Sequence, residues 1–171
     1  MLNRIMKSKI DSRDLEILQT LQNDGRATYS SMARQLKISE AAVYTRVNRL
    51  LSSGYIKKFT AILDENKLNF SIGAFIGIKV SPSKYEAVLK QLALYPEILE
   101  IHDVTGDYYA LLKVRTRDKE SLATLLDKIG KLDGVISTET KIILRTIKES
   151  TALPLQLLSG MKVAHSLQTK V

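Results

Sequence analysis

One stretch decides the fold of the first third of the chain: Leu36-Lys37-Ile38-Ser39-Glu40-Ala41-Ala42-Val43-Tyr44-Thr45-Arg46-Val47-Asn48-Arg49-Leu50. It predicts the end of one helix, a tight turn, and a second helix whose first N–H groups are capped by the Ser39 side chain. On a helical wheel Val43, Val47 and Leu50 share one side, which predicts the side that packs on the core. The opposite side carries Ala41, Tyr44, Thr45, Asn48 and Arg49. This layout is typical of a helix-turn-helix, whose second helix lies in the major groove of DNA.

Two more helices are predicted before this stretch. Asp11 or Ser12 caps the first, which ends at Asn23-Asp24-Gly25, and Thr28 caps the second. Gly54 ends the third helix, and the apolar and polar residues of 55–63 indicate a strand or wing. Residues 1–63 are therefore predicted to form a winged helix-turn-helix DNA-binding domain.

A second domain is predicted over residues 70–155, after a hinge at 64–69 and before a tail at 156–171. Period-two alternation predicts a strand over 72–80, and Ser81-Pro82 starts a helix. Two strands (98–105 and 108–115), a helix from Asp118 and a last strand (135–146) follow. The order βαββαβ predicts a ferredoxin-like, four-stranded antiparallel sheet covered by two helices, so the whole chain is α+β.

The charge is concentrated in the predicted helix-turn-helix. Of the net charge of +8, residues 1–63 carry +6, from eleven Lys/Arg against five Asp/Glu. This favours a polyanion-binding head, although a solvated basic surface explains the charge alone equally well. Asn48 suits adenine, and Arg49 suits guanine or a phosphate. Backbone phosphate contacts are expected from the flanking residues Arg34, Lys37, Lys57 and Lys58.

Several classes of protein are disfavoured by what the sequence contains. There is no cysteine, no apolar run long enough to span a membrane and no signal-peptide pattern at residues 1–7, so a cytoplasmic protein is expected. His102 and His165 are far apart, which indicates no metal site. No catalytic set or glycine-rich phosphate loop is visible, so neither an enzyme nor a cofactor is expected.

The residues resemble a family, the Lrp/AsnC or feast/famine transcriptional regulators, of the archaeal type. The likeness runs in order over residues 10–155 and rests on Asp14-Leu15-Glu16-Ile17-Leu18, Asp24-Gly25-Arg26, Ile38-Ser39, Val104-Thr105-Gly106-Asp107-Tyr108 and Thr151-Ala152-Leu153-Pro154-Leu155. It implies homodimers that pair through the sheet of the second domain and assemble further into a tetramer of dimers, an octamer. It also implies that a small amino acid binds the second domain and alters assembly or DNA affinity.

The effector is expected at the turn formed by Thr105, Gly106, Asp107 and Tyr108. Gly106 allows N–H groups to hold a carboxylate, Asp107 can pair with an ammonium group, and the other two add hydroxyls. The resemblance implies that Ser137, Thr138 and Thr140 on the last strand complete the pocket across a subunit seam, and glutamine is our expected effector. The family often has a second acid where Tyr109 stands, which leaves the ligand class open, and a plain hairpin turn is the alternative.

A dimer interface is expected on the first strand of the second domain. Gly73 and Gly77 leave one sheet face flat around Phe75, and an exposed aromatic face is expected to be covered by a partner; the alternative is that the glycines mark a bulge.

Two other functions stay open: an architectural protein that binds all duplexes without an effector, and an RNA-binding ferredoxin-like module, although the aromatic signature of the latter is absent.

Overall fold

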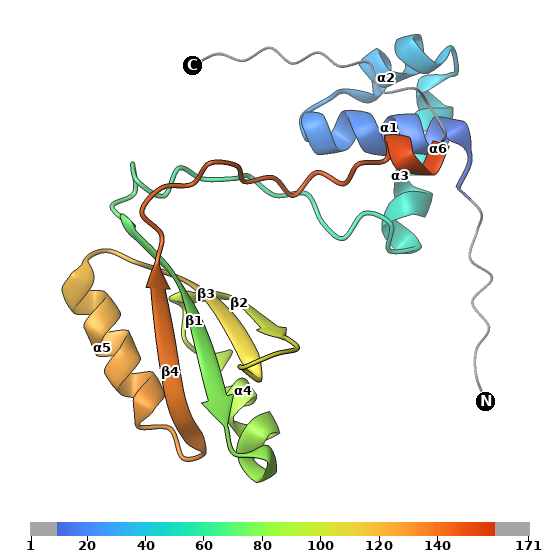
Figure 1. The fold of residues 1–171 in the computed structure, drawn as a ribbon. Coiled ribbons are helices and arrows are strands. Elements are labelled where there is room, and N and C mark those ends of the chain that lie inside the picture. The colour runs from blue at the N-terminus through green and yellow to red at the C-terminus, as the bar shows by residue number, and fades with distance from the viewer. Residues whose placement is uncertain (1–9, 160–171) are drawn as a thin grey trace. The chain divides into compact units, whose positions relative to one another are not determined.

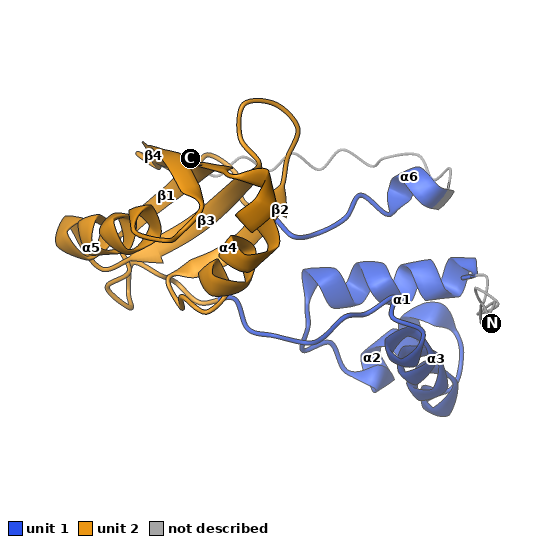
Figure 2. Ribbon diagram, turned by 90° about the horizontal axis from the view of Figure 1, so that it is seen from below, with its two compact units in different colours: residues 1–62, 150–171 blue, residues 63–149 orange. Residues whose placement is uncertain are grey.

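The computed structural model describes residues 10–159. The N-terminal residues considered for a signal peptide, His165 and the part of the predicted tail from 160 on lie outside the described residues. The chain divides into two compact units: a helical unit that extends to Ile62 and resumes at Ser150, and a sheet unit from Leu63 to Glu149 (Figure 2).

Three helices form the core of the helical unit: α1 (Ser12–Asn23), α2 (Tyr29–Leu36) and α3 (Glu40–Ser52) (Figure 1). The predicted caps are confirmed, because the Asp11, Thr28 and Ser39 side chains each accept a backbone N–H of the helix that follows. The buried residues include the predicted stripe of α3, Val43, Val47 and Leu50, together with Ile17, Met32, Ala33 and Leu36. The three helices therefore share one small apolar core.

The predicted wing does not contain a strand. Residues 53–71 form turns, bends and irregular backbone, with no helix or strand assigned. A strand requires a neighbouring strand to accept and donate its backbone hydrogen bonds, and none of the four described strands belongs to the helical unit. The strand predicted at 55–63 is therefore wrong, and this segment follows the third helix without pairing.

The end of the described chain returns to the helical unit, which differs from the predicted domain boundary at 155. The side-chain amide of Gln22 donates to the Leu153 carbonyl (2.9 Å) and accepts from the Leu153 N–H (3.0 Å). A four-residue helix, α6 (Gln156–Ser159), follows. No local sequence pattern predicts this contact, because it joins residues 131 positions apart.

The sheet unit has the predicted βαββαβ order. Its elements are β1 (Ile72–Val80), the 3-10 turn η1 (Pro82–Lys84), α4 (Tyr85–Leu92), β2 (Ile98–Asp103), β3 (Ala110–Thr116), α5 (Lys119–Gly130) and β4 (Val135–Ile142). The strands lie in the order β2-β3-β1-β4, all antiparallel, which confirms the ferredoxin-like sheet. β4 is shorter than predicted, since it ends at Ile142 and not at 146.

Helices α4 and α5 pack on one face of this sheet (Figure 1). Alternate residues of β1 and β3 point into the core beneath them, together with Val88, Leu92, Leu122, Leu125 and Ile129 from the helices. The other sheet face carries no helix of the unit, and Phe75 on it is 37% exposed. Across residues 10–159, we find no helix with the length and apolar character that crossing a membrane would require.

Candidate DNA interface and candidate effector site

The candidate reading helix α3 has the exposed face that the sequence predicts. Ala41, Tyr44, Thr45 and Asn48 are exposed, whereas Val43, Val47 and Leu50 are completely buried. Tyr44 retains 55% of its surface although its ring meets Tyr29 edge-on at 5.9 Å. The Thr45 hydroxyl donates to the Ala41 carbonyl (2.9 Å), so its oxygen remains available as an acceptor. The face therefore presents short and polar groups on a rigid support.

Arg49 differs from the other predicted DNA contacts because it is paired within the protein. Its Nη2 donates to the Asp14 carboxylate, and 39% of its side chain is exposed. Arg46, three residues earlier, donates from Nη1 to Asp11 and to Asp14, both at 2.7 Å. The two arginines thus join the flank of α3 to the first turn of α1.

Asp14 lies at the centre of this network and has no exposed surface. It accepts the Asp11 N–H (3.0 Å), while its own N–H donates to the Asp11 carboxylate (2.9 Å), which is a reciprocal capping box. Burial acts to raise the pKa of Asp11, but the Asp14 amide and the Arg46 guanidinium outweigh it and hold that pKa below its usual value. The hydrogen bonds from Arg46 to Asp11 and Asp14 raise the pKa of Arg46.

The predicted phosphate contacts belong to the same unit and are exposed. Arg34 is on α2, Lys37 is in the turn before α3, and Lys57 and Lys58 are in the extended segment after it. Lys37 adopts a left-handed backbone (φ 53°), and its N–H caps the end of α2. Its side chain therefore extends from the turn itself, immediately before the reading helix.

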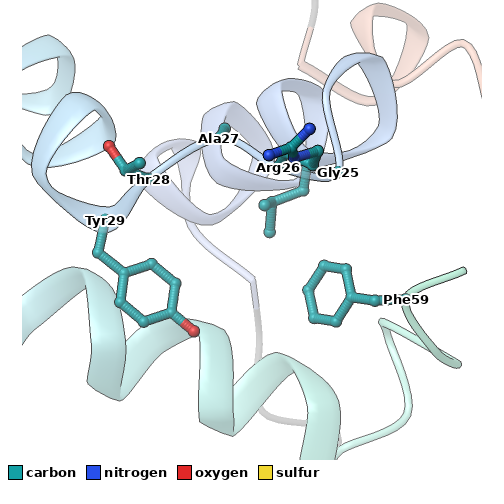
Figure 3. A pocket seen from close by; sticks show the side chains of 7 residues that line it. Gly25, Arg26, Ala27, Thr28, Tyr29 and Phe59 are labelled. Atoms are coloured by element: carbon teal, nitrogen blue, oxygen red, sulfur yellow. The ribbon is translucent and has the colours of Figure 1, made fainter. Parts of the chain in front are cut away.

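A shallow hollow of about 360 Å³ lies beside the junction of α1 and α2. Figure 3 shows the Tyr29 and Phe59 rings on opposite sides of it, with Arg26 and Thr28 on the loop between the helices. Tyr29 therefore has one side on this hollow and its ring edge-on to Tyr44 of the reading helix. The sequence analysis did not single out Tyr29, because an aromatic residue in the first turn of a short helix carries no specific signal.

The candidate effector turn spans the loop between β2 and β3. Val104 N–H donates to the Tyr109 carbonyl (3.3 Å) and closes the loop. Gly106 has φ +113°, a conformation that L side chains rarely adopt, as the predicted turn requires. Thr105 and Asp107 are exposed, and within residues 10–159 neither side chain has a hydrogen bond or ion pair. Their polar groups are therefore available to a ligand.

Tyr108 is not brought together with Thr105 and Asp107. Its ring lies over Gly77, where a Cβ atom would come within 2.7 Å of Tyr108 Cγ. The Tyr108 hydroxyl bonds to Glu139, and Lys141 lies 5.4 Å from the ring centre. The open face at Gly73 is similarly occupied by Arg115, which also pairs with Glu65. The glycines thus make room for side chains of this chain, and the expectation of a flat bare face around Phe75 is wrong.

The three β4 residues implied for the pocket do not share one face. Ser137 pairs with Lys79, whereas Thr138 and Thr140 pair with Ile78 and Ile76. Because neighbouring residues of a strand point to opposite faces, Ser137 lies on the open face and the threonines on the face that bears the helices. One pocket surface cannot use all three from the same β4 strand.

A second polar cluster near the turn was also missed. The Tyr85 hydroxyl donates to Asp103 and lies 3.3 Å from the Tyr109 carbonyl, and the two tyrosine rings are 6.0 Å apart. Burial, with the hydrogen bond to Asp103 and the charge of that carboxylate, raises the pKa of Tyr85 to about 12. Among residues 10–159 as a whole, no group of three or more His, Cys, Asp or Glu residues could hold a metal ion.

A helix-turn-helix with an exposed polar face, joined to a βαββαβ domain, defines the class of two-domain DNA-binding regulators. Residues 10–57 match the winged helix-turn-helix DNA-binding domain, and residues 73–153 match the Lrp/AsnC ligand binding domain. The chain belongs to the Lrp/AsnC family of transcriptional regulators, which confirms the resemblance seen in the sequence.

Named relatives and solved structures agree with this. The HTH-type transcriptional regulator FL11 of Pyrococcus horikoshii is 43% identical over 151 residues, which cover 88% of this chain and all of the relative. The regulatory protein AsnC of Haemophilus influenzae is 40% identical, covering 81% and 97%. A Neisseria meningitidis transcriptional regulator in complex with L-Met has a TM-score of 0.84 at 27% identity, covering 88% and 99%. Escherichia coli AsnC has a TM-score of 0.80 at 31% identity, covering 84% and 98%.

Proposed function

We propose that this regulator recognises its operator with the exposed face of α3, formed by Ala41, Tyr44, Thr45 and Asn48. The observation that carries the proposal is that these side chains are exposed on a helix whose opposite face is completely buried. A helix held in this way can enter the major groove, where short side chains reach base edges. Arg34, Lys37 and Lys57 then contact phosphates on either side and set register without reading sequence.

The turn at Thr105–Asp107 is the proposed site of a small amino-acid effector. Gly106 supports a backbone that can present N–H groups to a carboxylate, and the Asp107 carboxylate can pair with the ammonium group. The L-Met complex of the Neisseria relative supports an amino acid as the ligand class. Either Ser137 or the pair Thr138 and Thr140 completes the pocket, and glutamine is our candidate among polar effectors.

Assembly is the proposed route from effector to DNA. Phe75 is exposed on the sheet face that carries no helix, between the side chains that cover Gly73 and Gly77. A second copy covering this face gives a homodimer, with two reading helices for the two halves of an operator. We propose further association into a tetramer of dimers. Light scattering tests this: a monomer at all concentrations contradicts it, and Phe75→Glu should weaken the dimer.

Operator recognition is tested with duplexes selected from a random library by the wild-type protein. Asn48→Ala should weaken binding to the selected duplex by about 1–3 kcal/mol and leave binding to random duplex nearly unchanged. Arg34→Ala, the matched control, should weaken both duplexes equally because a phosphate contact carries no sequence information. If Asn48→Ala leaves operator affinity intact, α3 is not the reader.

Effector binding is tested by thermal shift against the twenty amino acids. A ligand at 100 times its Kd stabilises the protein by about 2.7 kcal/mol. Asp107→Asn should abolish the shift, whereas Asp127→Asn, an exposed carboxylate on α5, should retain it. A shift that survives Asp107→Asn would place the effector elsewhere.

An architectural protein without an effector is the second candidate, because the basic charge of residues 1–63 favours any duplex. Equal affinity for selected and random duplexes, with no amino acid shifting the transition, would support it. Preferential binding to single-stranded RNA would favour an RNA-binding module instead.

We propose that the protein acts in the cytoplasm as a regulator and not as an enzyme.

A further inference from the structure

The buried carboxylate of Asp14 is used by two arginines of the reading helix. Asp14 has no exposed surface, and its oxygens accept from the Asp11 N–H, from Arg46 Nη1 and from Arg49 Nη2. All its partners belong to α3 or to the N-cap of α1. Since the polar atoms of buried side chains among residues 10–159 all have partners, this network is complete without a ligand.

The position of the two arginines on α3 determines which movements of this helix the network restricts. Arg46 and Arg49 are three residues apart, so they lie next to each other along one flank of the helix. That flank separates the buried stripe from the exposed face that holds Asn48 and Thr45. Apolar contacts between helices resist separation but permit small rotations and slides, whereas charge-assisted hydrogen bonds have a strict geometry. The two arginines therefore restrict rotation and sliding of α3 relative to α1.

The same contacts determine what Arg49 can do. The sequence predicts Arg49 as a DNA contact because it lies beside the reading face. In the structure 39% of its side chain is exposed. A phosphate that took Nη2 itself would withdraw a charge-assisted hydrogen bond from a carboxylate with no exposed surface, and weakening the pairing of a buried charge is costly. The pair inside the protein is therefore the favoured one.

We propose that Asp14 is the positioning residue of the DNA-reading helix: it fixes α3 through Arg46 and Arg49, and it holds Arg49 as an internal partner instead of a DNA contact. This rests on the proposed role of α3. A residue of α1 that touches no DNA then determines how well the chain distinguishes its operator from other duplexes.

The test measures operator and random-duplex affinity of the full-length chain by fluorescence anisotropy over roughly 50–200 mM salt. Asp14→Asn should lower operator affinity about tenfold, the size of one lost base contact, and change random-duplex affinity little. Glu16→Gln, on the same helix and outside the network, is the matched control and should change neither. Because Asn cannot pair with two guanidinium groups, the double variant Asp14→Asn/Arg49→Ala should lose little more than Asp14→Asn alone.

Salt dependence separates positioning from phosphate binding. Arg34→Ala should reduce the slope of log K against log salt by about 0.9, as expected for one lost phosphate contact. Arg49→Ala should lower the operator preference and leave the slope unchanged, and Arg49→Lys, which can still reach Asp14, should recover part of the preference. Circular dichroism of each variant shows that it is folded at the assay temperature.

Two results would overturn the proposal. One is a folded Asp14→Asn protein with the wild-type ratio of operator to random-duplex affinity. The other is a fall of about 0.9 in slope for Arg49→Ala, with equal losses on both duplexes, which would make Arg49 a phosphate contact. Should Asp14→Asn not fold, the two Arg49 variants decide the question alone. Failure of the α3 assignment itself is recognised separately, by Asn48→Ala.

Discussion

Two aspartates of the chain, Asp14 and Asp107, lie in opposite structural settings. Asp14, in the first turn of α1, is fully buried and accepts from a backbone N–H and two arginines. Asp107, in the loop between β2 and β3, is exposed and has no hydrogen bond or ion pair within residues 10–159. The oxygens of the first carboxylate are all engaged in hydrogen bonds that hold the proposed DNA-reading helix. The second retains its bonding capacity, which is what a site that binds a ligand requires.

The largest expected effect tests this contrast directly. Asp14→Ala should lower the free energy of unfolding of the helical unit by about 2–4 kcal/mol, because it removes the charge-assisted hydrogen bonds to Arg46 and Arg49 and the bond from the Asp11 N–H. Asp107→Ala should change stability by less than about 0.5 kcal/mol in the absence of effector. Native-state hydrogen exchange reports the two units separately. A loss below about 1 kcal/mol for Asp14→Ala would refute the account of the network.

A smaller effect is expected from the backbone of the effector turn. Gly106→Ala should cost about 1–3 kcal/mol, although a Cβ atom there would meet nothing within 4 Å, because φ +113° is unfavourable for alanine. Gly130→Ala, at the end of α5 and also in open space, has no such φ and serves as the control. Thermal unfolding measures both. Equal stability of the two variants would show that the loop readily takes another conformation.

The return of the chain to the helical unit is expected to contribute about 1 kcal/mol. Gln22→Ala removes the two hydrogen bonds to the Leu153 backbone, each of which is solvent-exposed. The expected result is faster hydrogen exchange at the Leu153 amide, with little change in the core amides of α1 and α3. Gln35→Ala, an exposed glutamine on α2, should not alter that amide. Unchanged exchange at Leu153 in the Gln22 variant would contradict the contact.

The smallest effect is a pH dependence that comes from Asp11. Its pKa is below the ordinary value of 3.8 in the folded protein, so its ionised form favours folding. That contribution is present above the unfolded pKa and is lost as the pH falls through the lower folded pKa. Asp11→Asn retains a good cap, so its stability deficit against wild type should be constant from pH 7 to about 5 and shrink below about pH 4. Denaturant titrations at each pH measure it; a constant deficit down to pH 2.5 would contradict it.

Capping and periodicity made most of the fold predictable. Asp11, Thr28 and Ser39 each precede a helix whose apolar residues recur at helical spacing, and the three helices begin where these residues predict. Alternation along 72–80 similarly predicted β1. The strand predicted at 55–63 was wrong because a strand needs a neighbouring strand to pair with, and none is present in the described helical unit.

The candidate site was predictable only in part, because polar residues have several partners open to them. Asn48 and Asp107 are exposed as the sequence analysis expected. Arg49 was expected to face DNA, but the packing of α1 on α3 brings it to a carboxylate 35 residues away. Tyr108 was expected in the turn, yet its ring lies over Gly77. In both cases the side chain contacts a residue distant in the sequence instead of taking the role that the sequence predicted.

The sequence by itself determined the helices with their caps, the order of helices and strands along the chain, and the family, since each depends on residues a few positions apart or on a motif read in order. Only the tertiary structure decided that Asp14 joins Arg46 and Arg49, that Ser137 and Thr138 face opposite ways around β4, and that Leu153 returns to Gln22. These contacts depend on which faces pack together and on strand register. A hydrophobic pattern specifies that a face is buried, but not which polar groups meet at its border.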